Sequence, residues 1–119
     1  MADEALFLGW GEIVRGRESK AVDVFNESVQ YYGQLQQDGA IESVEAWFLA
    51  PHGGDLAGFI LLRGERERLD EIERSPEFER LQTRAAMIAD RTGAIHAYTG
   101  DSLARLMGQF QEATGDLGA

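Results

Sequence analysis

The sequence predicts an α+β fold in which four strands form one antiparallel sheet with helices on one face. Three observations support this. Ile41–Gly64 places two apolar runs around a loop of Pro, His, Gly and Asp, as in a β-hairpin. Segments of helical periodicity flank this hairpin, and a further strand-like run lies outside each of them. Because 119 residues suit one domain, we expect a single domain over 1–119.

The first predicted strand is Ala5–Trp10, which has apolar residues on both faces. The period becomes helical from about Arg17 to Asp38, and Gly39 stands where a left-handed C-terminal cap belongs. The apolar residues of this helix recur every three or four positions and form one stripe. They are Val22, Phe25, Val29 and Tyr32.

Within the hairpin, Phe59–Leu62 is continuously apolar, which is typical of a strand buried on both faces. The charged segment 65–74 that follows reads as a short, solvated helix with Leu69 and Ile72 facing inward. Ser75-Pro76 then predicts a new helix start, because Ser is a good N-cap and Pro fits the first helical position.

The buried stripe of this second long helix is expected to end near Asp90, before a fourth strand at Ala94–Thr99. A last helix is predicted to begin at an Asp101-Ser102 cap. The two predicted stripes are Phe78, Leu81, Ala85 and Ile88, and then Leu103, Leu106, Met107 and Phe110.

The resulting order is β-α-β-β-α-β with a trailing helix, which is the order of a ferredoxin-like sheet. In that topology the first and third strands are central, and these two are the ones that are apolar on both faces. Helices on one side leave the second apolar face uncovered. We expect a second copy of the chain to cover it in a homodimer, with the trailing helix as the smaller alternative cover.

In this element order, in the strand after the first helix and in the helix start Ser75-Pro76-Glu77-Phe78, the stretch from Leu6 to Thr99 resembles the dimeric α/β-barrel proteins. In that group, two ferredoxin-like subunits pack sheet against sheet. It includes antibiotic-biosynthesis-type monooxygenases and many small uncharacterised domains. The resemblance implies a pocket between helices and sheet in each subunit, often used for an apolar or aromatic molecule. It assigns no catalytic residue to this chain.

Composition excludes several function classes. A net charge of −10 argues against nucleic acid and against anionic membrane surfaces as partners. The absence of cysteine excludes disulfides and thiolate chemistry, and it fits a cytoplasmic location. No cofactor is expected. A metal site would need His52, Asp55 and His96 to converge, and their spacing predicts no such site.

The sequence offers His52, His96 and Tyr98 as catalytic candidates. His52 lies among glycines in the hairpin loop, where Asp55 could orient it as an acid or base, or where the whole loop is simply a turn. His96 and Tyr98 share one face of the last strand. They either line a pocket or form a pair on an edge strand whose polar groups reach solvent or the dimer interface.

Four residues are candidates for binding a substrate, and Asp55 of the hairpin loop is one of them. Trp10 and Trp47 are either pocket walls for a flat ligand or packing residues. Arg63, at a strand end, is either a clamp for a ligand carboxylate or a partner for nearby glutamates.

Three functions therefore remain open. The first is a dimeric domain that binds a small, partly apolar or aromatic molecule. The second is a cofactor-free monooxygenase or isomerase acting on an aromatic substrate, with Trp10, Trp47, His96 and Tyr98 around the pocket and His52 as the base. The third is a structural module that only self-associates. Whether the protein is an enzyme stays undecided at this point.

Overall fold

A computed structural model describes residues 2–115 and 117, so four positions of the expected domain 1–119 lie outside the described residues. The strands are β1 (Glu4–Trp10), β2 (Ser43–Phe48), β3 (Gly58–Arg63) and β4 (Gly93–Tyr98). The helices are α1 (Glu18–Gln37), α2 (Arg66–Glu73), α3 (Pro76–Ile88) and α4 (Gly100–Gly115). This is the predicted α+β order, with the charged segment forming α2.

The described strands form one antiparallel sheet in the order β2-β3-β1-β4. Strands β1 and β3 are central, as their apolar sequences predicted, and the hairpin of β2 and β3 is present. Leu6 lies opposite Leu62 on one side and His96 on the other. The ferredoxin-like topology is therefore confirmed.

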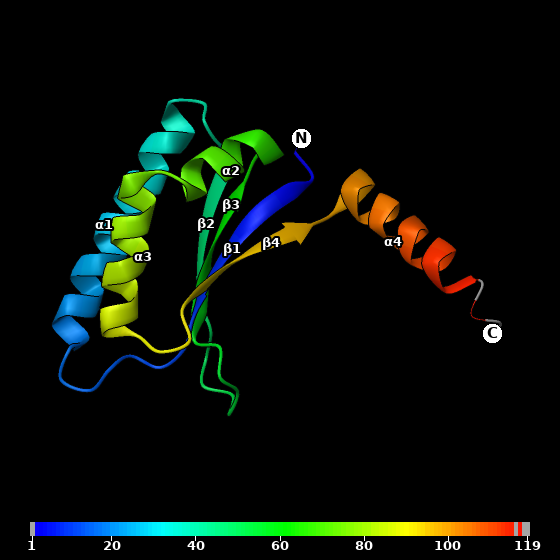
Figure 1. Ribbon diagram of the computed structural model, residues 1–119. Coiled ribbons are helices and arrows are strands. Elements are labelled where there is room, and N and C mark those ends of the chain that lie inside the picture. The colour runs from blue at the N-terminus through cyan, green and yellow to red at the C-terminus, as the bar shows by residue number, and fades with distance from the viewer. Residues whose placement is uncertain (1, 116, 118–119) are drawn as a thin grey trace.

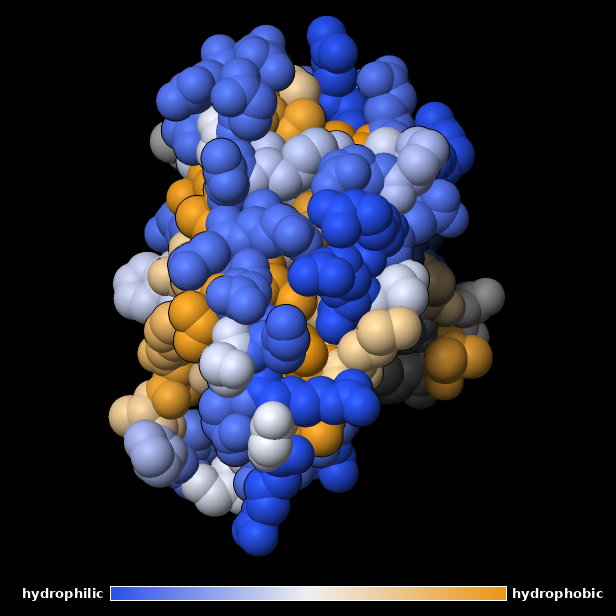
Figure 2. All heavy atoms as spheres, turned by 90° about the vertical axis from the view of Figure 1, so that its left-hand side faces the viewer, coloured by the Kyte–Doolittle hydropathy of each residue, from blue (hydrophilic) through white to orange (hydrophobic). Residues whose placement is uncertain are grey.

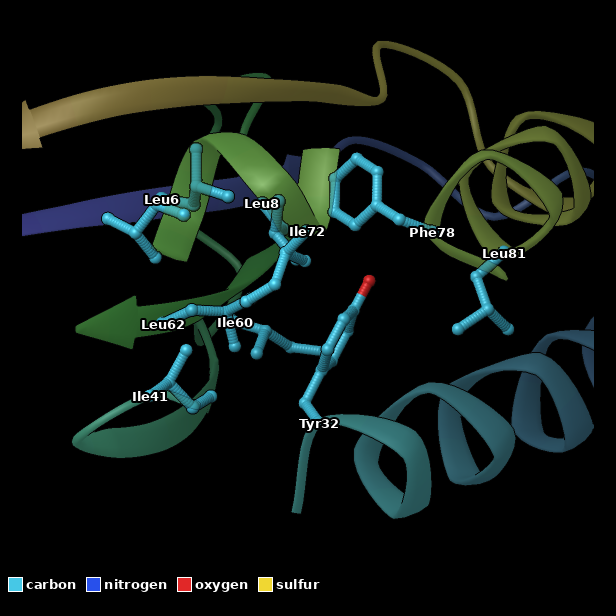
Figure 3. Close-up of a cluster of buried hydrophobic side chains, with 10 residues drawn as sticks. Leu6, Leu8, Tyr32, Ile41, Ile60, Leu62, Ile72, Phe78 and Leu81 are labelled. Carbon is cyan, nitrogen blue, oxygen red and sulfur yellow. The ribbon is translucent and has the colours of Figure 1, made fainter. Parts of the chain in front are cut away.

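Helices α1 and α3 lie side by side over one face of the sheet, and α2 packs at the end of that face beside β1 (Figure 1). The core fills the space between sheet and helices (Figure 3). Its buried side chains are Leu6, Leu8, Tyr32, Ile41, Ile60, Leu62, Leu69, Ile72, Phe78 and Leu81. Leu69 and Ile72 thus face inward as predicted.

The buried face of α1 includes Tyr32 of the predicted stripe but not Val22. Val22 is 58% exposed, whereas the neighbouring stripe of Ala21, Val24, Ser28 and Tyr32 is buried. Phe25 and Val29 flank this stripe and are partly buried against the core. The prediction was therefore wrong for Val22, because the small residue Ala21 takes the buried position beside it.

Two helix ends behave as the sequence predicted. Gly39, just past α1, has φ +78°, and the N–H of Ala40 donates to the carbonyl of Leu35. At the start of α3, Ser75 Oγ accepts a hydrogen bond from the N–H of Phe78 at 3.2 Å, with Pro76 in the first helical position. Local sequence therefore determines both boundaries.

The other face of the sheet carries an apolar surface that no helix of the described chain covers. We call it the open face, and it comprises Phe7, Trp47, Phe59, Leu61 and Ile95. The rings of Phe7 and Phe59 stack there with centroids 4.7 Å apart. Burial along β3 alternates, so the prediction of a strand buried on both faces is not met within one chain.

Helix α4 does not cover the open face of its own chain. It projects beyond the end of β4, away from the rest of the molecule (Figure 1). It begins at Gly100, and the side chain that caps it belongs to Asp3, not to Asp101 as predicted. The local cap prediction was wrong because the cap comes from the other end of the chain.

Across residues 2–115 and 117, we find no helix that combines the length and the hydropathy needed to cross a membrane.

Candidate functional site

A cavity of about 550 Å³ lies between the sheet and helices α1 and α3. Leu8 and Ile60 form its floor on the sheet, and residues of α1 and α3 form its sides. Val22 also lines it and is more than half exposed, which places it at the mouth. The volume falls in the range of small-molecule sites in proteins.

Three aromatic rings form one wall of the cavity. Trp10 meets Phe25 and Phe48 edge to face, with ring centroids 6.1 and 5.9 Å apart. The rings of Phe25 and Phe48 lie 4.9 Å apart. These residues come from β1, α1 and β2, so the wall exists only when the helix is docked on the sheet. Such a wall offers flat, apolar contact to an aromatic ligand.

The indole of Trp10 packs closely against the backbone of β3 because its partner there is Gly58. A methyl group at position 58 would come within 2.6 Å of Trp10 Cζ2 and 2.7 Å of the Trp47 carbonyl oxygen. Glycine is therefore required for this ring position.

Small side chains leave empty space beside this wall. The cavity is lined by Ala21 and Ser28 on α1, by Ala85 on α3 and by Ala89 just beyond it. The hydroxyl of Ser28 donates to the carbonyl of Val24 at 2.8 Å, so it is occupied within its own helix. The cavity is thus lined mainly by hydrocarbon.

The polar lining is sparse and includes one buried tyrosine. Burial, and to a lesser degree Tyr31 and Glu77, raises the pKa of Tyr32 well above its usual range, so its hydroxyl stays protonated. Figure 3 shows Tyr32 rising from α1 with its oxygen directed toward the space between Ile72 and Phe78. The remaining polar lining residues are Glu18, Asn26, Gln82 and Thr92.

Figure 2 shows the helical side of the molecule from outside. Hydrophilic side chains dominate this surface, and hydrophobic atoms show in the gaps between them. The apolar lining of the cavity therefore sits beneath a mostly hydrophilic outer layer.

The structure separates the two tryptophans, which the enzyme hypothesis places around one pocket. Trp10 lines the cavity. Trp47 points to the opposite side of the sheet, where it is 52% exposed on the open face. Their positions follow from the strand registers, since Trp10 pairs with Gly58 and Trp47 pairs with Phe59.

His52 is held within its own loop. Its Nδ1 accepts from the N–H of Gly54 at 3.2 Å, so Nε2 is the protonated nitrogen and donates to the carbonyl of Leu56 at 2.8 Å. Asp55 does not contact it and instead pairs with Arg91 at 2.7 Å. These contacts match the turn interpretation of the loop rather than a His–Asp pair.

His96 and Tyr98 face the helical side of the sheet, but they lie under α2 and do not line the cavity. His96 Nε2 lies 2.7 Å from Glu73 Oε1. Arg66 donates to Tyr98 Oη at 3.4 Å. The two residues therefore belong to a polar cluster that joins α2 to the edge strand β4.

Arg63 ends β3 on the side of the open face, opposite Ala5 and Ser43. The aromatic wall lies at the other end of the sheet, where Trp10 pairs with Gly58. Among the residues that the structure describes, Arg63 is not one of those that line the cavity. The predicted carboxylate clamp is therefore not part of this site.

The one group of potential metal ligands in the described residues is Asp70, Glu73 and His96, whose ligand atoms lie within 4.8 Å of one another. The loop between β2 and β3, which contains His52 and Asp55, lies at the other end of the sheet from α2 (Figure 1). His96 Nδ1 is buried without a hydrogen-bond partner, whereas metal-bound histidines almost always donate this second N–H. Arg66 also lies 3.9 Å from Asp70. The group fits a histidine–carboxylate contact better than a metal centre.

Sequence reasoning missed this cluster and most of the cavity. Asp70 and Glu73 are three residues apart on a helix, so they share a face, but a charged helix is usually solvated. The cavity residues Ala21 and Ala85 have no functional group that would mark them as site residues in a sequence. Trp10 was found because it is a large aromatic residue on a strand.

Comparisons with known proteins support the fold and assign no function to the site. No protein-family description and no curated protein matches the sequence. Among solved structures, the chain is similar to a dimeric protein of unknown function with a ferredoxin-like fold from Bacteroides fragilis, with a TM-score of 0.58 at 9% identity. That likeness covers 81% of this chain and 96% of the other.

The chain is also similar to SnoaB, a cofactor-independent oxygenase from Streptomyces nogalater, with a TM-score of 0.53 at 13% identity over 83% of this chain and 93% of the other. An uncharacterised NIPSNAP domain protein from Burkholderia xenovorans gives a TM-score of 0.48 at 8% identity, covering 82% and 95% of the two chains. At these identities, the likenesses to the Bacteroides fragilis protein and to SnoaB establish a shared ferredoxin-like fold.

Proposed function

We propose that the protein is a homodimeric domain that binds a small, largely apolar, flat molecule in the cavity between the sheet and helices α1 and α3. The observation that carries this proposal is the aromatic wall of Trp10, Phe25 and Phe48 facing a space of about 550 Å³. A protein interior is normally packed to near crystal density, so a hydrocarbon-lined space of this size supports a binding role.

The homodimer rests on separate support. The open face exposes Trp47 and Ile95 by more than half, and an apolar sheet face of this kind is typical of an interface. A second copy of the same sheet offers a self-complementary cover through a two-fold axis. The dimeric Bacteroides fragilis protein of the same fold is in keeping with this assembly.

Binding is favoured over catalysis in this cavity. Among the residues that line it, Glu18 and Tyr32 are the titratable ones, and the hydroxyl of Tyr32 stays protonated. Both histidines make their hydrogen bonds elsewhere. The cofactor-free oxygenase or isomerase remains the alternative, and its support is the fold likeness to SnoaB.

A pair of neighbouring alanines on α3 allows a sharp test of the binding site. Ala85 lines the cavity, and the adjacent Ala86 is exposed and does not. Ala85→Trp should fill the space, whereas Ala86→Trp adds the same side chain outside it. The probe is N-phenyl-1-naphthylamine, a neutral aromatic dye whose fluorescence rises in apolar surroundings.

We expect the wild-type chain and Ala86→Trp to bind the dye with one site per protomer, and Ala85→Trp to lose at least about 90% of the signal, because the added indole occupies the site. Circular dichroism checks that both variants fold. Equal dye binding by both variants would place the dye elsewhere and contradict the proposed site. Native mass spectrometry of protein purified from cells then reports any co-purified small molecule and the number of subunits.

A further inference from the structure

Helix α4 is fixed to the body of the protein at its first turn. Asp3 Oδ2 accepts the N–H of Ser102 at 2.8 Å, and Asp3 Oδ1 accepts the Ser102 hydroxyl at 2.9 Å. The backbone N–H of Thr99 also donates to the carbonyl of Asp3 at 2.8 Å. Ser102 itself is buried. The direction in which α4 leaves the sheet is therefore set by specific contacts.

Beyond this first turn, α4 presents an apolar stripe to solvent. Leu103, Met107 and Phe110 are 44%, 49% and 63% exposed, and Leu106 is half-buried. Their spacings of three and four residues place them on one face of the helix. A single helix of 16 residues is marginally stable in water, and most helices in proteins are stabilised by packing such a face. This stripe has no such cover within the described chain.

The stripe and the open face are arranged as parts of one surface. Figure 1 shows α4 on the opposite side of the sheet from α1 and α3, which is the side of the open face. Helix α4 follows directly after β4, the strand that carries Ile95 on the open face. A partner that covers the open face is therefore within reach of α4.

The charges on this surface favour a second copy of the chain as the partner. The chain has a net charge of −10, so two copies repel each other unless they meet where charge is low or balanced. The charged residues of α4 are Asp101, Arg105 and Glu112. The strands add one charge of each sign on this side, Glu45 and Arg63. The surface is thus nearly neutral on a strongly acidic protein.

We infer that α4 is a docking arm for a second copy of the chain: its stripe of Leu103, Leu106, Met107 and Phe110 packs on the partner subunit beside the sheet-to-sheet contact. This inference rests on the homodimer proposed above and adds to it. In such a dimer each chain contributes one arm, so the two-fold symmetry buries two stripes in addition to the two open faces.

Two methionines of similar exposure provide a matched test in the full chain. Met107 lies in the stripe of α4, and Met87 lies on α3, on the helical side of the sheet, with exposed fractions of 49% and 56%. We expect Met107→Glu to weaken the dimer at least about tenfold in sedimentation equilibrium, because it brings a charge into an apolar contact. Met87→Glu should leave the dissociation constant unchanged within about twofold, since surface changes outside an interface have small effects.

Hydrogen exchange of the wild-type chain, above and below the dimer dissociation constant, separates this inference from the dimer itself. Protection of the α4 amides that appears only in the dimer, together with the Met107→Glu effect, supports the docking arm. A dimer whose α4 amides exchange equally fast in both states, and which Met107→Glu does not weaken, overturns the arm and keeps the homodimer. A chain that stays monomeric at all concentrations overturns both.

Discussion

The carboxylate of Asp3 binds the first turn of the last helix through Ser102, a residue 99 positions further along the chain. One oxygen accepts the backbone N–H and the other accepts the hydroxyl. The side chain therefore acts as an N-cap supplied from another element, which satisfies a backbone donor that the helix itself cannot pair. The contact connects the segment just before β1 with the segment just after β4.

Removing the Asp3 carboxylate should increase hydrogen exchange in the first turn of α4 and leave the rest of the protein nearly unchanged. In Asp3→Ala, the amides of Ser102 to Arg105 are expected to exchange several-fold faster than in wild type, because the cap hydrogen bonds are lost. Asp3→Asn keeps an acceptor oxygen and should retain most of the protection. Hydrogen exchange followed by mass spectrometry measures both variants. Unchanged exchange in Asp3→Ala would show that the first turn is held by other contacts.

The same contact predicts how α4 responds to acid. Hydrogen bonds from the Ser102 side chain and backbone lower the pKa of Asp3 from its usual value of 3.8. A group whose pKa is lower in the folded state stabilises that state above its unfolded pKa and loses this contribution as the pH falls through its folded pKa. Ser102 amide resonances should therefore be unchanged at neutral pH and shift only below the usual Asp range. In Asp3→Asn this acid transition should be absent.

Two glycines should respond to alanine in opposite directions. Gly58→Ala is expected to destabilise the protein and displace Trp10, since the new methyl group would collide with the indole and with the Trp47 carbonyl. Gly33 lies within α1 with no atom in the way of a methyl group, so Gly33→Ala should stabilise by about 0.5–1 kcal/mol. Urea unfolding measures both changes, and dye binding should fall only in Gly58→Ala. Equal stability of the two variants would contradict the packing of Trp10.

The contact between His96 and Glu73 can be tested with a neighbouring glutamate as control. Glu73→Ala removes the hydrogen-bond partner of a partly buried ring and should cost about 1 kcal/mol. Glu71 is exposed on the same helix, and Glu71→Ala should change stability by less than about 0.5 kcal/mol. Both are measured by urea unfolding at neutral pH. Equal effects would mean that α2 is not tied to β4 by this pair.

The architecture was accessible from the sequence because its signals are local. Strand periodicity, the glycine after α1 and Ser75-Pro76 each act within a few residues. The central position of β1 and β3 followed from their apolar residues on both faces. The cap of α4 could not be predicted in this way, because Asp3 is adjacent to Ser102 only in the folded sheet.

The candidate site was less accessible, because a cavity consists of missing side-chain volume. Sequence reasoning selects residues that carry chemistry, such as His52 and His96, and the fold places neither of them at the cavity. The choice of the buried face of α1 also affected the prediction of the site. Because Val22 was taken as buried in place of Ala21, the small residues that leave room beside Trp10 were not recognised.

The small side chains that line the cavity make its shape easy to alter during evolution. Ala21, Ser28, Ala85 and Ala89 project into the space from α1 and from the end of the α3 segment. Enlarging any one of them changes the shape of the cavity while the sheet and the core around Leu6 and Leu62 stay in place. Under the binding function proposed above, single substitutions would shift the range of accepted molecules without rebuilding the fold, and descendants of one ancestral chain would diverge in ligand through changes of a few methyl groups.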